Sequence, residues 1–353
     1  MSPPAPADDP RKILIVKPSA LGDVITALPV LHALRRRFPG VHIAWLVNKA
    51  LSGALAGEES LDEVIVFDRR GMSAAWKNAP LPEKPLRFHR AVKDLNNRLK
   101  DAQFDWALDL QGLFRSGYFT WSTGAPLRVG FRQAREMAGL FYNFKISAPL
   151  SLHTIDRNLK LAEALGLQPR AEDFRLHPSG AALEWLEEFL RLNGLTPGQY
   201  IVCNPATTWK TKEYPRGHWK EVIRSLSEDL PVVLTGGPED FQLAADIASD
   251  LPGKVVNQAG QTDIPQYIAT IACSRGVICP DSAAKFIAEA TGVFSIVLHG
   301  PTRPERTGTW KRGADLQSPL SCSGCLKKHC PQCRCMDQIA PERVVSAARE
   351  HLL

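Results

Sequence analysis

The sequence predicts an α/β protein with two domains, each built on a parallel sheet. Three observations support this fold class. The chain has 353 residues, whereas a single domain usually takes about 100–200. Short apolar runs alternate with amphipathic helical segments, which is the pattern of strand–helix–strand units. The alternation pauses at the loop-like stretch 177–180 and then restarts, so we place one domain at 1–178 and a second at 179–337.

The N-terminal half begins with the run KILIVK at 12–17, whose β-branched apolar residues predict a buried strand. The turn PSALGD leads into a helical segment at 24–38, which Pro39 and Gly40 end. Further strands are predicted at 41–47, 63–68 and 104–112. In the second half, helices are predicted at 182–195, 218–230, 240–251 and 340–353, and strands at 200–208, 231–237, 254–260, 276–282 and 294–300.

Composition restricts the class of protein. No apolar run approaches the roughly 20 residues of a membrane span. The acidic, proline-rich start MSPPAPADDPRK lacks the features of a signal peptide, so we expect a cytoplasmic protein with mostly reduced cysteines. The net charge of +6 is concentrated in the first half, and residues 69–100 alone hold nine basic and two acidic side chains. This stretch is either a solvated face or a contact with an anionic acceptor, membrane or nucleic acid.

Ligands of open parallel sheets bind beyond the carboxyl ends of the strands, so the loops that follow strands are the candidate sites. The first loop holds Gly22 and Asp23 at the start of a helix. Asp23 is either a helix-capping acid or a general base that takes a proton from an attacking hydroxyl. The second loop, NPATTWKTKEYP at 204–215, brings hydroxyls and lysines together. It is either an ordinary polar loop or a phosphate cradle.

Two further loops follow strands in the second half. In TGGPED at 235–240, an acid either caps a helix or accepts a hydrogen bond from a sugar hydroxyl. In CPDSAAK at 279–285, a helix begins, and its free N–H groups suit a diphosphate as well as a capping side chain. No GxxxxGK[ST] or GxGxxG motif is present, which argues against a P-loop nucleotidase and a nicotinamide enzyme. The basic residues also lack the interleaved aromatics of a nucleic-acid-binding module.

Several segments together resemble a known family. They are KPSALGDVITALPVLHALRRRFP, DLQGLFRSG, QAREMAGLFYNFK, NPATTWKTKEYPRGHW, LTGGPED, PDSAAKFIAEATG and HGPTRPERTG, in this order. Over residues 11–345 the sequence is similar to the lipopolysaccharide heptosyltransferases of glycosyltransferase family 9. The similarity is greatest to the branch that adds the first heptose to Kdo.

The resemblance implies a GT-B fold, in which two Rossmann-like domains with parallel sheets face a central cleft. It implies that the N-terminal domain binds the acceptor and the C-terminal domain the ADP-sugar, with the last helix, about 338–353, packing back on the N-terminal domain. It implies inverting transfer from ADP-L-glycero-D-manno-heptose to the Kdo/heptose inner core of lipopolysaccharide, with no metal or other cofactor required. The expected location is the cytoplasmic face of the inner membrane, as a peripheral protein that binds no nucleic acid.

The resemblance also assigns roles to residues. Asp23 is the expected general base and Lys212 the expected diphosphate-binding cation, and both are counted as catalytic. The expected donor-binding residues are Ser19, Ala20, Leu21, Gly22, Thr207, Thr208, Gly236, Glu239, Asp240, Asp281, Ser282, Ala283 and Ala284. For the anionic acceptor we select four cations of the N-terminal half: Arg115, Arg132, Arg135 and Lys145.

The sequence departs from the family at one motif, which usually reads DSG with a histidine three residues beyond the glycine. Here Ala283 stands for the glycine and Phe286 for the histidine. A lost sugar or phosphate contact would change the donor preference or weaken activity, and the neighbouring Lys285 is a candidate substitute cation. A transferase for another nucleotide sugar and a non-catalytic nucleotide-sugar-binding relative are therefore the alternative functions.

A second feature is a cysteine-rich segment near the C-terminus. Its five cysteines are Cys322, Cys325, Cys330, Cys333 and Cys335. The CxxC pairs are consistent with a structural zinc site, with reduced thiols or with a disulfide, and spacing does not decide among the three. The remaining cysteines, Cys203, Cys273 and Cys279, lie in apolar runs and are expected in the core.

Overall fold

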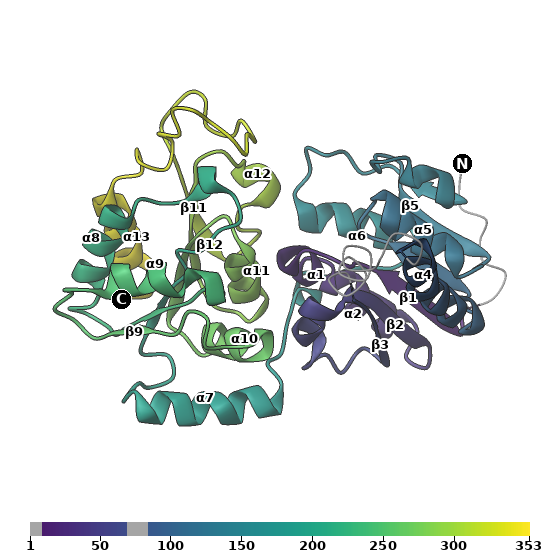
Figure 1. Ribbon diagram of the computed structural model, residues 1–353, viewed down its shortest axis with the longest axis horizontal. Helices are drawn as coiled ribbons and strands as arrows, with labels where there is room; N and C mark the ends of the chain where they lie inside the picture. The colour runs from purple at the N-terminus through teal and green to yellow at the C-terminus, as the bar shows by residue number, and fades with distance from the viewer. Residues whose placement is uncertain (1–8, 69–83) are drawn as a thin grey trace. The chain divides into compact units, whose positions relative to one another are not determined.

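The computed structural model of the protein describes residues 9–68 and 84–353, and the chain divides into two compact units, Met1–Phe174 and Arg175–Leu353 (Figure 1). Each unit holds a six-stranded sheet whose paired strands are all parallel. The predicted α/β class with two Rossmann-like units is therefore confirmed. Residues 69–83, the first half of the basic stretch considered above, lie outside the described residues.

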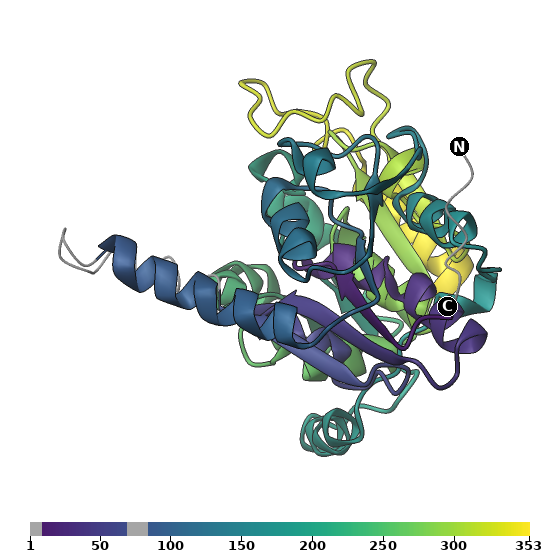
Figure 2. The same cartoon turned by 90° about the vertical axis from the view of Figure 1, so that its right-hand side faces the viewer.

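The N-terminal sheet has the order β3-β2-β1-β4-β5-β6. Its strands are β1 (Lys12–Val16), β2 (His42–Asn48), β3 (Glu63–Phe67), β4 (Trp106–Asp109), β5 (Leu127–Phe131) and β6 (Phe144–Ile146). Its helices are α1 (Leu21–Ile25), α2 (Leu28–Arg37), α4 (Lys84–Asp101), α5 (Phe114–Ser122) and α6 (Thr154–Ala164), with short 3₁₀ turns η1 (Lys49–Leu55), η2 (Ala138–Phe141) and η3 (Ala171–Asp173). Figure 2 shows α4 as a long helix that extends from one end of this unit.

The central strand β1 illustrates why strands of the N-terminal unit were predictable from apolar runs in the sequence. Ile13 to Val16 are fully buried, because β1 pairs with β2 on one side and β4 on the other and helices cover both faces. The single helix expected at 24–38 is instead two helices. Pro29 stands in the first turn of α2, where its missing N–H costs no intrahelical bond, so the chain starts a new helix there.

The C-terminal sheet has the order β12-β11-β10-β7-β8-β9. Its strands are β7 (Ile201–Cys203), β8 (Val232–Leu234), β9 (Val255–Asn257), β10 (Gly276–Pro280), β11 (Ser295–His299) and β12 (Gly313–Gln317). Its helices are α7 (Gly180–Leu192), α8 (Arg216–Leu226), α9 (Phe241–Ala248), α10 (Ile264–Ala272), α11 (Ala283–Ala290), α12 (Pro304–Thr307) and α13 (Pro341–Leu352), with 3₁₀ turns η4 (Lys210–Lys212) and η5 (Pro238–Asp240).

The last helix differs from its expected position. We expected it to pack on the N-terminal domain, but α13 packs on α8, β11 and β12 of its own unit. Val344, Ala348 and Leu352 are fully buried in the core of that unit. Gly276 has no side chain at the point where Leu352 lies, so the helix end fits closely against β10. Among the described residues, no helix is long and apolar enough to cross a membrane.

Candidate functional sites

In the N-terminal unit, the candidate site lies at the carboxyl ends of β1 and β4. Asp23 occupies the third position of α1, and its carboxylate accepts a hydrogen bond from the backbone N–H of Ala20 at 3.0 Å. The other carboxylate oxygen lies 3.8 Å from Nζ of Lys17, and the Asp23 side chain is 42% exposed. Asp23 therefore does cap the helix. Its carboxylate nevertheless remains accessible to solvent, and the Ala20 N–H and the Lys17 ammonium group orient it.

Lys17 was not predicted as a site residue. It follows four buried strand residues, is itself buried, and donates to the backbone oxygen of Leu110 at 2.6 Å. Burial lowers the pKa of Lys17, while Asp23 and Asp109 oppose that shift. Asp109 is fully buried and accepts hydrogen bonds from Tyr142 Oη at 2.6 Å and from two backbone N–H groups. Its pKa is raised by burial, against those hydrogen bonds.

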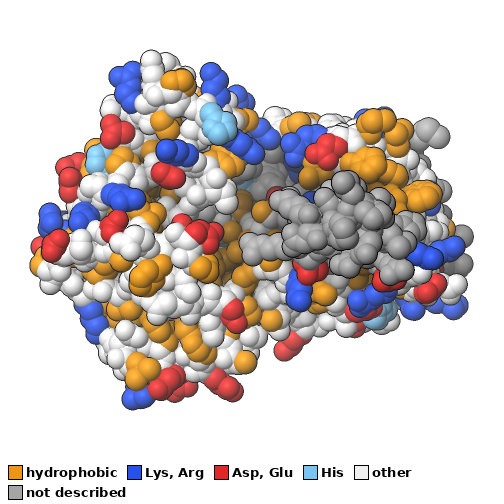
Figure 3. Space-filling view, viewed as in Figure 1, with side chains coloured by type: hydrophobic (Ala, Val, Ile, Leu, Met, Phe, Trp, Pro, Cys, Tyr) orange, Lys and Arg blue, Asp and Glu red, His pale blue; other side chains and the backbone are white. Residues whose placement is uncertain are grey.

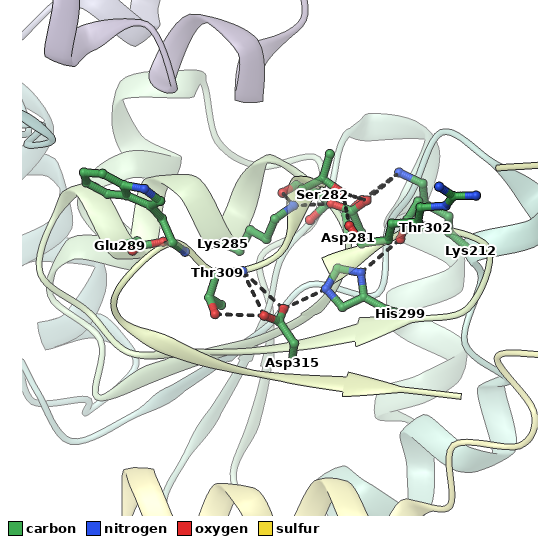
Figure 4. Close-up of polar contacts among 12 residues, drawn as sticks. Lys212, Asp281, Ser282, Lys285, Glu289, His299, Thr302, Thr309 and Asp315 are labelled. Carbon is green, nitrogen blue, oxygen red and sulfur yellow. Dashed lines mark hydrogen bonds and ion pairs between the residues drawn. The ribbon is translucent and has the colours of Figure 1, made fainter. Parts of the chain in front are cut away.

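In the C-terminal unit, the candidate site is centred on Asp281, which follows β10. Figure 4 shows Lys212 and Lys285 approaching Asp281 from opposite sides. Lys285 forms a buried ion pair with one carboxylate oxygen of Asp281, and its side chain is only 1% exposed. Lys212 Nζ lies 3.6 Å from the other oxygen and donates to the backbone oxygen of Asp281 at 2.9 Å. Thr307 Oγ1 donates to that same carboxylate oxygen at 2.9 Å.

The charges of this cluster do not cancel. Two ammonium groups surround one carboxylate, and the Lys212 and Asp281 side chains are only 13% and 7% exposed. Burial alone would raise the pKa of Asp281, but Lys285 and then Lys212 outweigh it and lower that pKa. Burial also lowers the pKa of Lys212, and Asp281 opposes the shift. A buried cluster with one unit of excess positive charge favours an anionic ligand.

The departure from the family motif has a structural explanation. Phe286 is 6% exposed and belongs to the buried side of α11, so the position expected to hold a histidine is part of the packing. Lys285, one residue earlier, turns to Asp281 instead, with its Nζ 4.1 Å from the Phe286 ring centroid. Asp281 and Lys285 stand four residues apart across the start of α11, a spacing that places them on the same face.

The other expected donor residues of the C-terminal unit follow strands at the same edge of its sheet, whereas Ser19, Ala20, Leu21 and Gly22 belong to the N-terminal unit, before and at the start of α1. Thr207 is half-buried and Thr208 exposed on the loop after β7, while Ser282, Ala283 and Ala284 begin α11. Asp240 accepts a hydrogen bond from the backbone N–H of Gly237 at 2.8 Å and so caps η5, which agrees with the helix-capping alternative considered for this loop. A side chain at Gly236 would meet Asp240, so the glycine permits this turn. Glu239 is exposed.

Two buried anchors support this edge. His299, at the end of β11, is held between Thr302 Oγ1 at 3.0 Å and Asp315 Oδ1 at 2.7 Å (Figure 4). Glu289, on α11, accepts hydrogen bonds from the backbone N–H groups of residues 310–312. These contacts fix the loop that follows α12, and α12 carries Thr307. Thr307, within the segment HGPTRPERTG, thus hydrogen-bonds Asp281, a contact that the sequence alone did not reveal.

The four cations chosen for the acceptor lie on the N-terminal unit. Arg132, Arg135 and Lys145 are exposed, and Arg115 on α5 places its guanidinium 5.6 Å from the Phe67 ring centroid. The backbone N–H of Arg135 donates to Gly112 at 2.9 Å, which ties its loop to the end of β4.

The cysteine-rich segment lies against the Lys212 loop. Thr211 Oγ1 donates to the backbone oxygen of Lys327 at 2.9 Å, and Lys328 Nζ lies 5.0 Å from the Trp209 ring centroid. All five of its cysteines are free thiols. Among the residues that the structure describes, no three histidine, cysteine or acidic side chains are placed to hold a metal ion, so the zinc alternative is not supported. Cys203 and Cys279 are core residues as predicted, and Cys273 is half-buried.

Comparisons with known proteins agree with this arrangement. The family described as glycosyltransferase family 9 (heptosyltransferase) matches residues 92–335. A curated relative, lipopolysaccharide heptosyltransferase 1 of Pseudomonas aeruginosa, is 28% identical over 97% of this chain and 98% of its own length. The crystal structure of a family 9 glycosyltransferase from Veillonella parvula superposes with a TM-score of 0.80 at 20% identity, covering 97% of both chains. Escherichia coli heptosyltransferase WaaC with ADP-2-deoxy-2-fluoro heptose superposes with a TM-score of 0.73 at 24% identity, covering 96% of this chain and 99% of that one. The architecture is that of the GT-B heptosyltransferase structures.

Proposed function

The chain belongs to glycosyltransferase family 9 (heptosyltransferase), and we propose that it transfers heptose from ADP-L-glycero-D-manno-heptose to the Kdo/heptose inner core of lipopolysaccharide. The name of the Pseudomonas relative and the ADP-heptose analogue in the Escherichia coli structure support this donor and acceptor. The single observation that carries the proposal is the buried cationic cluster of Lys212, Asp281 and Lys285, which suits a diphosphate.

We assign donor binding to the C-terminal unit. The diphosphate lies against Lys212 and the first turn of α11, whose N–H groups have no partner within the helix. Lys285 already neutralises Asp281, so Lys212 keeps its positive charge for the ligand. Thr207 and Thr208 add hydroxyl donors, and Gly236, Glu239 and Asp240 form a polar turn for the ribose or sugar.

The N-terminal unit supplies the base. The Asp23 carboxylate accepts the proton of an acceptor hydroxyl. As this proton leaves, the hydroxyl oxygen attacks the anomeric carbon of the donor from the face opposite ADP. The new C–O bond forms as the bond from the anomeric carbon to the diphosphate oxygen breaks, which inverts the configuration. Ala20 N–H and Lys17 hold the carboxylate in one orientation. ADP leaves with the bonding electron pair, and Lys212 stabilises the charge that develops on its diphosphate.

This account needs no metal, because a lysine and helix N–H groups supply the positive charge at the leaving group. It places the acceptor on the basic N-terminal unit, with Arg115, Arg132, Arg135 and Lys145 toward its carboxylates and phosphates. The protein then works at the cytoplasmic face of the inner membrane, where it contacts the bilayer as a peripheral protein.

The test is ADP release by purified protein with Kdo₂–lipid A and a panel of ADP- and UDP-sugars. Turnover with ADP-heptose supports the proposal. Turnover with another donor alone would favour the alternative that Ala283 and Phe286 have changed the donor preference. Binding of ADP-heptose without any turnover would favour a non-catalytic relative.

A further inference from the structure

Four large hydrophobic side chains are exposed on one part of the N-terminal unit. Phe114 and Trp121 on α5 are 52% and 54% exposed, and Met137 and Leu140 at η2 are 70% and 72% exposed. We call these four residues the apolar surface. Large exposed apolar groups that gather in one place usually mark an interaction site, whereas scattered ones need no explanation.

The four side chains belong to one surface. Phe114 and Trp121 stand seven positions apart, about two helical turns, so they share one face of α5. Phe141 of η2 packs on both, with ring centroids 5.3 Å from Phe114 and 6.5 Å from Trp121. Gly117 allows this close approach, because a side chain there would meet the Phe141 ring. Leu140 precedes Phe141, and Met137 directly precedes η2.

The backbone holds Met137 outward at a conformational cost. Glu136 and Met137 both adopt left-handed conformations, with φ of 54° and 61°, which non-glycine residues rarely do. Such a cost persists only where the surroundings or a function maintain it. The Glu136 carboxylate accepts the backbone N–H of Phe114 at 3.3 Å, which ties the turn to the start of α5.

The surroundings of the apolar surface are basic. Between residues 113 and 145 the sequence has five basic side chains and one acidic side chain, Glu136. Arg132, Arg135 and Lys145 are exposed. Figure 3 shows hydrophobic side chains gathered on the N-terminal unit with blue basic side chains near them. Aromatic and aliphatic side chains beside exposed cations match the interfacial zone of an anionic bilayer.

We propose that the apolar surface docks on an anionic lipid bilayer, with its aromatic and aliphatic side chains in the headgroup zone and its cations on lipid phosphates. The inference deepens the proposed function, since it rests on that function for a lipid-linked acceptor and names the residues of the membrane contact. A second copy of the chain fits this surface less well. A twofold dimer would set like-charged surroundings against each other, which is unfavourable.

The experiment is co-sedimentation of the full chain with vesicles of phosphatidylethanolamine and phosphatidylglycerol, beside neutral phosphatidylcholine vesicles. The test variant is Trp121→Ser with Leu140→Ser. The matched control is Leu183→Ser with Leu192→Ser, because these leucines are 41% and 68% exposed on α7 of the other unit. We expect the wild type and the control to bind anionic vesicles, and the test variant to bind about tenfold more weakly. Neutral vesicles should bind the wild type less, and added salt should weaken the binding.

Equal vesicle binding by the test variant and the control would overturn the proposal. So would a wild-type dimer, detected by sedimentation velocity, that the test variant loses. ADP release with a deacylated, water-soluble acceptor separates the two proposals, since a folded test variant should turn this acceptor over like the wild type. If the wild type shows no turnover and its vesicle binding still depends on Trp121 and Leu140, the proposed function fails and the docking surface stands.

Discussion

The ammonium group of Lys212 lies 2.9 Å from the backbone oxygen of Asp281 and 3.6 Å from its carboxylate. The same carboxylate is already paired with Lys285 and bonded to Thr307. Lys212 is therefore positioned by Asp281 without being neutralised by it. Under the proposed function, this relationship would leave a buried lysine available to an incoming diphosphate.

The first prediction concerns that lysine. Lys212→Met should lower kcat for ADP release about 100- to 1000-fold, because the leaving diphosphate loses a preorganised cation. Lys210→Met is the matched control, since Lys210 lies two residues away on the same turn and is exposed. Steady-state kinetics of both variants check this prediction. Equal losses of kcat in the two variants would contradict a specific role for Lys212, because they would show that only the total positive charge of this turn matters.

The second prediction concerns Lys285. Lys285→Met removes the closest partner of the buried Asp281. Leaving a buried charge without a partner typically costs about 3–5 kcal/mol in the free energy of unfolding, and Lys212, 3.6 Å away, should offset part of that cost. Lys212 should then pair fully with Asp281 and bind ADP more weakly. Urea unfolding and calorimetric titration with ADP measure the two effects.

A double variant separates stability from binding in this cluster. Lys285→Met with Asp281→Asn removes both charges and should recover much of the lost stability. If ADP binding requires Asp281 to position Lys212, the double variant should not recover its affinity for ADP. Full recovery of both would contradict the role of Asp281 in positioning Lys212.

The third prediction concerns the proposed base. Asp23→Asn should keep the cap on Ala20, because an asparagine oxygen also accepts from a backbone N–H. Stability and ADP affinity should therefore change little, while kcat falls about 100- to 10,000-fold through loss of the general base. Thermal unfolding, ADP titration and turnover of one preparation check all three. Near-normal turnover would remove Asp23 from the mechanism.

The fourth prediction is a pH dependence of stability. The folded-state pKa of Asp281 lies below its ordinary value, because Lys285 and Lys212 outweigh the opposite effect of burial. A depressed pKa of this kind stabilises the fold fully above about pH 5, and the contribution decreases as the pH falls below about 4. As the pH falls, the free energy of unfolding of the wild type should therefore decrease relative to that of the Lys285→Met, Asp281→Asn double variant, which lacks this carboxylate. A difference that stays constant from pH 7 to about pH 3.5 would contradict this linkage.

Much of the fold followed from local sequence. The central strands β1 and β10 are buried apolar runs, and each ends in a polar loop, so these strands and the candidate loops after them were predictable. The strands β5 and β6 were not predicted. The strand β12 was missed because GADLQ is polar and half-buried at a sheet edge, without the apolar signal of a strand. The packing partner of α13 was also not predicted correctly. An amphipathic pattern indicates that a helix packs on something, but it does not indicate which unit.

The candidate site was predictable in part. Asp23, Lys212 and Asp281 stood in loops that follow strands, and the structure places each at such an edge. The roles of Lys17 and Thr307 depend on contacts with residues distant in sequence, so no local pattern identifies them. The spacing of Asp281 and Lys285 was visible in the sequence, but only their buried ion pair in the structure shows that Lys285 serves the carboxylate.

The most direct test of the central claim is mass-spectrometric analysis of Kdo₂–lipid A after incubation with ADP-L-glycero-D-manno-heptose, for the wild type and for Lys212→Met. The account predicts an acceptor that gains one heptose with the wild type and a product yield at least about 100-fold lower with Lys212→Met. An unmodified acceptor with the folded wild type, or equal yields from the two proteins, would contradict it.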